Sequence, residues 1–327
     1  MIASLSTLKD EMAGVCHRLY KAKLPEFRDA LLPSQRHLYD ELCKLPYDSR
    51  DWWRDYHDIV VVTNAMYLAT CESSIPHWLP TAALLHDRGY AALAVFKRAV
   101  GEEEYGSVTK SFWDTEDSRI AHSKLSREIA SWILTGECES EQVIALLRSC
   151  GIARVDVGLS EEEVSALLLA IEQHDLPLIG RYHEVSNDTK HHFDADSLYS
   201  ISITSFVKDY LFAVTDPEWI RRHAVVPAED FRPSDLLVVR AARYFDVFGE
   251  LPSELQEYLL QKDASIRERV FVRGRAGVIT PHSVEAQRLA CEAFGLLVRV
   301  CKVLEGGGAQ EEIVFAVEQL ARLELLR

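Results

Sequence analysis

The stretch LPTAALLHDRGYAALAVF, residues 79–96, sets an apolar pattern of helical period around a His-Asp dipeptide. Leu79, Ala82 and His86 recur at helical spacing, so His86 lies on the stripe expected to face the core, with Asp87 beside it. An aspartate is almost never fully buried without a partner. A divalent metal accepts a neutral imidazole and a carboxylate together, so this stretch predicts a metal site.

The charge balance of the chain excludes two classes of partner. The 327 residues carry a formal net charge of -15, with 48% hydrophobic and 27% charged residues. Binding to a nucleic-acid polymer or to an anionic membrane surface needs clustered Lys and Arg, so neither is expected. A small phosphorylated substrate needs only a local basic pocket and remains compatible with this charge.

The cysteines and the N-terminus indicate a reduced compartment. Seven cysteines are scattered without a CxxC pair, which argues against a disulfide framework or a zinc ribbon. The first 15 residues, MIASLSTLKDEMAGV, include acidic residues and lack the continuous apolar core of a signal peptide. Because no apolar run is long enough to span a bilayer, we expect a cytoplasmic protein with no membrane contact.

The fold class follows from the spacing of the apolar residues, which is helical throughout and almost never alternates. We therefore predict an all-α helical bundle with extra N- and C-terminal helices. Ser160 and Glu163 form a capping box that opens a helix, and residues 176–196 are expected to form a polar loop. Helices are expected over 197–215 and about 233–249, and a small hairpin is the alternative for 269–279.

Three segments are predicted along the chain. Residues 1–50 form N-terminal helices, 51–250 form a metal-binding helical domain, and 251–327 form a C-terminal helical extension. The extension carries no recognisable chemistry. Its helices either cap the bundle or form a contact between two copies in a homodimer.

Four separate helices are expected to place a histidine on a buried face. One is the helix of His86 and Asp87, and the others carry His57, His122 and His174. A single core-facing histidine is usually structural. Four together would leave the interior of a bundle full of unpaired polar groups unless a shared ligand joins them, and bundle interiors are a common place for metal sites.

The order and spacing of these residues resemble the HD-domain superfamily of metal-dependent phosphohydrolases. The matching segments are DYHDIVVVTNAMYLA around His57, AALLHDRGYA around His86 and Asp87, SRIAHSKLSREIA around His122, and LLLAIEQHDLP around His174. The resemblance covers roughly residues 50–250 and implies an all-α fold. It also implies a last aspartate ligand, for which the chain offers Asp216 or, as the alternative, Asp246.

The extra histidines His122 and His174 are similar to those of the binuclear members of the superfamily. The resemblance therefore implies two divalent ions, with Asp87 as the catalytic bridge between them. Iron, manganese, nickel and zinc all suit imidazole and carboxylate ligands, and the ligand set does not choose among them.

Hydrolysis of a phosphoester in a nucleotide or another small phosphorylated substrate is the expected reaction, with a metal-activated water as the nucleophile. The groups expected to bind that substrate are Arg88, Tyr90, Arg181, His183 and Lys190. A mixed-valent di-iron oxygenase with the same ligands is one alternative. A non-catalytic regulator on an HD scaffold is another, favoured by Arg243 and Tyr90 at positions where the family carries other residues.

Overall fold

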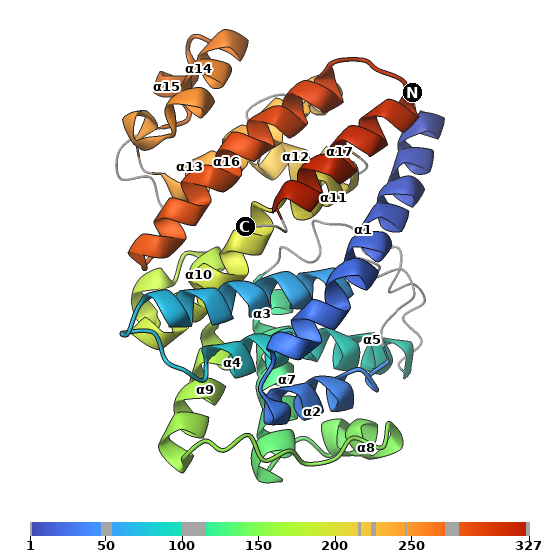
Figure 1. Ribbon diagram of the computed structural model, residues 1–327, viewed down its shortest axis with the longest axis vertical. Coiled ribbons are helices and arrows are strands. Elements are labelled where there is room, and N and C mark those ends of the chain that lie inside the picture. The colour runs from blue at the N-terminus through green and yellow to red at the C-terminus, as the bar shows by residue number, and fades with distance from the viewer. Residues whose placement is uncertain are drawn as a thin grey trace. The chain divides into compact units, whose positions relative to one another are not determined.

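Helices make up the regular structure of the protein, as the computed structural model in Figure 1 shows. The structure describes residues 2–46, 54–99, 116–214, 217–223, 227–245, 247–271 and 281–324. Within these ranges all regular secondary structure is α-helix or 3-10 helix, which confirms the predicted all-α class. Most of the segment 269–279, for which a hairpin was an alternative, lies outside the described residues.

Contacts between the helices divide the chain into two units. Among the described residues, unit 1 holds 2–19 and those from 197 onward, and unit 2 holds the remainder. The boundaries fall inside helix α1 (Ile2–Ala30) and helix α10 (Asn187–Ser200). They differ from the predicted divisions near residues 50 and 250, which stay a prediction.

Unit 2 carries the predicted metal ligands. Its further helices are α2 (Pro33–Leu42), α3 (Arg54–Cys71), α4 (Leu79–Leu85), α5 (Gly89–Ala99), α7 (Glu116–Thr135), α8 (Glu141–Ser149) and α9 (Glu161–Gln173). Helix α7 packs against α5 and α9, and helix α4 packs against α3 and α9. The helices that carry the predicted histidines are therefore direct neighbours in the fold.

Two local features of unit 2 follow from the sequence. The predicted capping box is present: the Ser160 hydroxyl accepts a hydrogen bond from the amide of Glu163, whose carboxylate accepts one from the amide of Ser160. These two hydrogen bonds supply acceptors for amides that would otherwise have no hydrogen-bond partner at the start of α9. Helix α9 then ends at Gln173, with His174 as its C-cap.

The structure differs from the sequence prediction at three points. The helix expected to run through residues 79–96 is broken, because α4 ends at Leu85 and α5 begins at Gly89. The loop expected over 176–196 contains two short 3-10 helices, η1 (Leu176–Ile179) and η2 (Tyr182–Glu184), and the first part of α10. The helix expected over 197–215 is interrupted before α11, which Ser202 caps.

Unit 1 is organised around the long helix α16. Its helices after α10 are α11 (Ile203–Ala213), α12 (Pro217–His223), α13 (Pro233–Tyr244), α14 (Ser253–Lys262), α15 (Ile266–Arg269), α16 (Val284–Glu305) and α17 (Gln310–Glu324). Helix α16 packs against α11, α13, α14 and α17. The buried face of α16 includes Phe294, Leu297 and Cys301, which recur at helical spacing.

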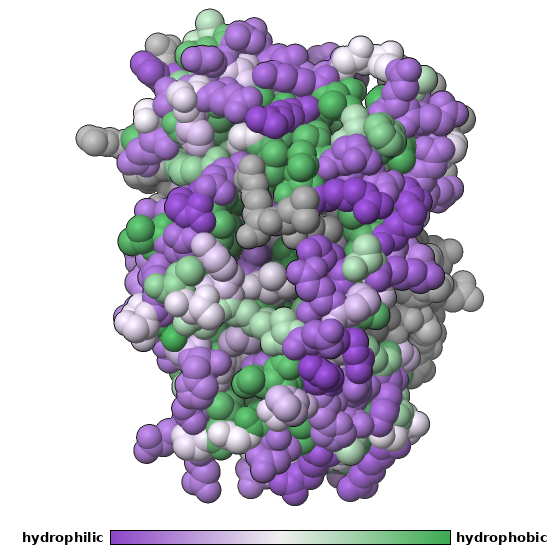
Figure 2. Space-filling view, viewed as in Figure 1, coloured by the Kyte–Doolittle hydropathy of each residue, from purple (hydrophilic) through white to green (hydrophobic). Residues whose placement is uncertain are grey.

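The described helices carry no membrane-spanning candidate, since none is both long and apolar enough to cross a bilayer. On the face that Figure 2 shows, hydrophilic residues predominate and hydrophobic residues are distributed among them. All seven cysteines are free thiols.

Candidate metal centre

The His-Asp dipeptide at 86–87 lies at the break between α4 and α5. His86 is the C-cap of α4, and its Nδ1 donates a hydrogen bond to the carbonyl oxygen of Ala83 at 2.8 Å. His174 repeats this arrangement as the C-cap of α9, with Nδ1 donating to the carbonyl oxygen of Ile171 at 2.6 Å. A backbone carbonyl that accepts from Nδ1 fixes the ring orientation and leaves Nε2 as the atom available to a metal.

The first group of candidate ligands consists of His57, His86 and Asp87. One ligand atom from each residue lies within 4.8 Å of the others, and all three residues are buried. The Nε2 atoms of His57 and His86 lie 3.7 Å from Oδ2 and Oδ1 of Asp87, respectively. Three buried side chains thus bring their ligand atoms close enough together to hold a cation.

The second group consists of Asp87, His122 and His174. Its ligand atoms also lie within 4.8 Å of one another, and its three residues are buried. The Nε2 atoms of His122 and His174 lie 3.4 and 3.6 Å from Oδ1 of Asp87 and 3.1 Å from each other. Helices α7 and α9 therefore bring together two histidines that are 52 positions apart.

Asp87 belongs to both groups, and its two oxygens face different histidines. Oδ2 is directed to His57, whereas Oδ1 is directed to His86, His122 and His174. Burial raises the pKa of the Asp87 carboxyl, but the imidazoles of His86, His122 and His174 hold that pKa well below its ordinary value. The side chain is therefore an ionised carboxylate that belongs to both groups of candidate ligands.

Asp196 is a ligand candidate that the sequence prediction missed. Its Oδ1 lies 3.1 Å from Nε2 of His57 and 3.5 Å from Nε2 of His86, so it adds a second carboxylate to the first group. Hydrogen bonds from His57 and His86 outweigh burial and hold the pKa of Asp196 well below its ordinary value. The two aspartates predicted for this role, Asp216 and Asp246, lie outside the described residues.

Two further carboxylates near the centre are paired with arginines. Asp58 follows His57, and its Oδ2 lies 2.6 Å from Nη2 of Arg88 with both side chains buried. Asp175 follows His174, and its Oδ2 lies 3.1 Å from Nη1 of Arg119 and 3.5 Å from Nε2 of His122. Each His-Asp dipeptide of the site thus supplies a histidine to the centre, and Asp87 is the carboxylate that reaches both groups.

Gly89 sets the distance between α5 and α7 at the centre. A Cβ atom at this position would lie 2.0 Å from the carbonyl oxygen of His122 and 2.8 Å from the amide nitrogen of Ser126. The amide of Gly89 also donates a hydrogen bond to Oγ of Ser126 at 2.8 Å. The close approach of the two helices, which brings Asp87 to His122, therefore requires glycine here.

His192 lies beside one histidine of each group. Its ring centroid is 5.0 Å from that of His86 and 5.9 Å from that of His174, and the side chain is fully buried. Neither ring nitrogen has a hydrogen-bond partner among the described residues. An unpaired buried polar group costs about 1–3 kcal/mol, so a ligand held at the centre, or the water that it binds, is the partner that would remove this cost.

Of the residues predicted to bind substrate, two lie beside the candidate ligands. The ring of Tyr90 stacks on that of His122, with centroids 4.1 Å apart and planes at 13°. Arg88 is buried, pairs with Asp58, and donates from Nε to the carbonyl oxygen of Leu84 at 2.6 Å. These bonds place Arg88 among the groups that support the centre.

The other three predicted substrate-binding residues lie later in the chain. Arg181 directly precedes η2, His183 belongs to η2, and Lys190 lies on α10. Arg181 pairs with the Glu184 carboxylate at 2.5 Å, and His183 is exposed. Lys190 lies over the ring of Tyr182, 5.2 Å from its centroid. No contact of these three residues with a candidate metal ligand is among the described interactions.

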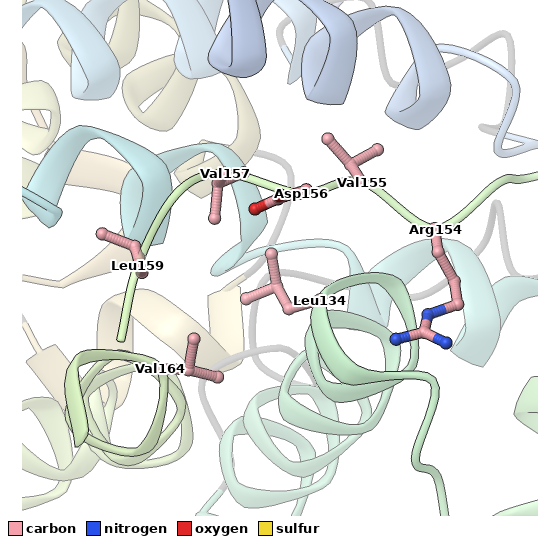
Figure 3. A pocket seen from close by; sticks show the side chains of 7 residues that line it. All are labelled: Leu134, Arg154, Val155, Asp156, Val157, Leu159 and Val164. Carbon is pink, nitrogen blue, oxygen red and sulfur yellow. The ribbon is translucent and has the colours of Figure 1, made fainter. Parts of the chain in front are cut away.

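A hollow elsewhere in unit 2 has a different lining. Its volume is about 460 Å³, and it is bordered by the C-terminal part of α7, the extended segment 154–159 and the start of α9 (Figure 3). The lining residues are Leu134, Arg154, Val155, Asp156, Val157, Leu159 and Val164. None of them is a candidate ligand, so this hollow is separate from the His/Asp groups.

The chain matches no known protein-family model, no curated protein and no solved structure at a significant level. The chemistry of the site is therefore argued from its residues. Buried imidazoles with Nε2 directed inward, together with ionised carboxylates, are a donor set that fits a divalent metal. The His/Asp groups of unit 2 could accordingly hold a metal ion.

Proposed function

We propose that the chain is a metal-dependent phosphohydrolase that cleaves a phosphoester of a small substrate at the centre in unit 2. The observation that carries this proposal is the position of Asp87, whose Oδ2 is directed to His57 and whose Oδ1 is directed to His86, His122 and His174. A carboxylate shared in this way suits two adjacent cations. The likeness of the sequence to the HD-domain superfamily supports the same interpretation.

Each residue of the centre has a defined task in this proposal. His57, His86, Asp87 and Asp196 would hold one divalent ion, and Asp87, His122 and His174 would hold a second. Two such ions would supply an activated water at neutral pH and would neutralise charge on the phosphate oxygens. Iron, manganese, nickel and zinc are the candidates for this donor set.

The protein groups around the ligands would keep them in place during the reaction. The carbonyl oxygens of Ala83 and Ile171 hold the rings of His86 and His174 in one orientation. Arg88 neutralises Asp58, which directly follows a ligand in the chain. Because the ligands are orientated before substrate arrives, little reorganisation is required during the chemical step.

Metal analysis of the purified chain followed by a phosphoester panel tests the proposal. We expect about two divalent ions per chain. When manganese, nickel, iron or zinc is bound, we expect hydrolysis of a phosphomonoester to phosphate or of a phosphodiester to a monoester. Asp87→Asn is expected to abolish both metal binding and hydrolysis, whereas His37→Ala, at an exposed position of α2, is expected to change neither. A chain that binds no divalent metal at micromolar concentration would contradict the proposal.

The oxygenase alternative uses the same ligands. Assays on the same metal-loaded preparation distinguish it from the hydrolase. Consumption of O₂ by the iron-loaded chain, with an EPR signal after partial oxidation and no hydrolysis of phosphoesters, would replace the hydrolase proposal. Tight metal binding without turnover of any substrate in either assay would favour a regulator.

A further inference from the structure

We propose that Arg119 binds the oxyanion of the substrate, a phosphate or phosphonate group, at the edge of the second group of ligands. This inference rests on the proposed function, because it places the anion beside the ion that Asp87, His122 and His174 would hold. Arg119 was not among the residues that the sequence indicated as substrate-binding. Its position in the structure is what assigns it this role.

The charged side chains of the centre are more exposed than its histidines. The side chains of His57, His86, His122 and His174 are between 1% and 5% exposed. The carboxylates are more open, with 12% of the Asp87 side chain and 18% of the Asp196 side chain exposed. Arg119 is similar, at 16%. The Arg119 side chain therefore has the partial exposure of the carboxylates, whereas the four histidines are almost closed to solvent.

The position of Arg119 on α7 directs its side chain to this edge. It precedes His122 by three residues, which places the two on one face of the helix. Its Nη1 lies 3.1 Å from Oδ2 of Asp175, and the same oxygen lies 3.5 Å from Nε2 of His122. One carboxylate thus holds the guanidinium next to a candidate ligand, in a fixed orientation.

The chemistry of the guanidinium suits a tetrahedral oxyanion. It has N–H donors in one plane and stays protonated at all ordinary pH values, and its Nη1 donates a hydrogen bond to Asp175. A planar fork of donors binds two oxygens of a phosphate or phosphonate at once. The stacked ring of Tyr90 lies on His122 and adds an apolar wall beside the same histidine.

The other basic residues near the centre are less suited to this task. Arg88 is 3% exposed and is held by Asp58 and the carbonyl oxygen of Leu84. Arg181 is paired with Glu184 outside the ligand groups. Of the arginines considered for the substrate, Arg119 alone combines partial exposure with a carboxylate that also contacts a candidate metal ligand.

Titration with inorganic phosphate, applied to the wild type and to arginine variants of helix α7, tests the proposal. The metal-loaded wild-type chain is expected to bind phosphate, and Arg119→Gln is expected to weaken that binding at least about tenfold while the metal content stays unchanged. Arg119→Lys should retain part of the affinity, because it keeps the charge and loses the fork. Arg127 lies on the same helix and pairs with Glu172, so the control variant Arg127→Gln should bind phosphate like the wild type.

The outcomes separate this inference from the proposed function. Unchanged phosphate affinity in Arg119→Gln would overturn the inference, and so would loss of metal in that variant, since Arg119 would then only position Asp175 and His122. If the chain binds no metal, phosphate titration of the metal-free chain still tests whether Arg119 binds an anion. Arg119-dependent binding there would support the anion site while the hydrolase proposal fails, and absence of phosphate binding in both preparations would overturn the inference.

Discussion

The Nε2 atoms of His122 and His174 lie 3.1 Å apart in the interior of unit 2. Burial lowers the pKa of both imidazoles, but the charge of Asp175 and the hydrogen bond to Asp87 raise that of His174 to about 9, whereas the pKa of His122 stays lowered. Without metal, a protonated His174 can therefore donate to a neutral His122. A divalent ion between the rings would replace that proton and bind both nitrogens together with Asp87.

The second group is expected to hold its own ion. His122→Ala or His174→Ala removes one of its two imidazoles, so each variant should lose about one of the two proposed ions per chain and retain the ion of the first group. Metal analysis after gel filtration measures this ratio. The exposed His37→Ala serves as the control. Two tightly bound ions in His174→Ala would contradict the assignment of His174 as a ligand.

The first group is expected to depend on Asp196. Replacement by Asn keeps the volume but removes the charge next to His57 and His86, and metal affinity should fall by more than the roughly 10- to 100-fold typical of an outer-shell partner. Competition with a chelating indicator measures the affinity. Asp188→Asn, near the start of the same helix, is the matched control. An unchanged affinity in Asp196→Asn would exclude this carboxylate as a ligand.

The histidine candidates could be predicted from the sequence because each occupies an apolar stripe or its continuation. Helical spacing placed His122 on the buried face of α7, and the stripe of α9 continued to His174. Spacing alone did not predict the break at His86, because the break depends on the approach of α5 to α7 at Gly89. That contact joins segments far apart in the chain, so no local pattern reports it.

Asp196 was missed for a physical reason. Residues 191–195 of α10 are all buried, so this part of the helix shows no alternation between an apolar and a polar face. The Pro, Gly and polar residues that precede it further favoured a loop over 176–196. The remaining signal was local: His192 and Asp196 are four residues apart, which places both on one face of any helix.

Gly89→Ala is expected to disrupt the second group. The added Cβ would lie 2.0 Å from the carbonyl oxygen of His122, so α5 and α7 must separate. Overpacking of this kind costs about 1–3 kcal/mol, and the shift should also reduce the metal content. Gly249→Ala is the control, since its Cβ would meet no atom within 4 Å. Normal stability and full metal content in Gly89→Ala would show that the helices adjust without affecting the centre.

Arg88→Met distinguishes a supporting role from the substrate contact expected from the sequence. The variant leaves the Asp58 carboxylate, which is 4% exposed, without its guanidinium. Removing one partner of a buried ion pair typically costs about 3–5 kcal/mol, and we expect a loss of that size in chemical denaturation. In the double variant Arg88→Met with Asp58→Asn much of the stability should return. A stable Arg88→Met chain with altered substrate affinity alone would instead support the substrate contact.

The Glu305 carboxylate is expected to make unit 1 sensitive to acid. It accepts hydrogen bonds from the Ser234 amide and the Tyr258 hydroxyl at 3.1 Å each, and it pairs with Lys262. Burial raises the pKa of Glu305, but Lys262, Ser234 and Tyr258 outweigh burial and lower that pKa below its ordinary value. This side chain joins the start of α13 and two side chains of α14 to the end of α16.

A group with a lowered pKa in the folded state stabilises the fold at any pH above its ordinary pKa, here about 4.3, and loses that contribution as the pH falls through the folded-state value. Glu305→Gln should therefore reduce the free energy of unfolding by about 1.5–3 kcal/mol at pH 7, the range for hydrogen bonds to a charged group. The difference from the wild type should shrink progressively below about pH 4.3. Urea titrations across this pH range measure both effects, with Glu257→Gln at an exposed position of α14 as the control. A difference between wild type and Glu305→Gln that is the same at pH 7 and in acid would show that the contribution comes from packing and not from the charge.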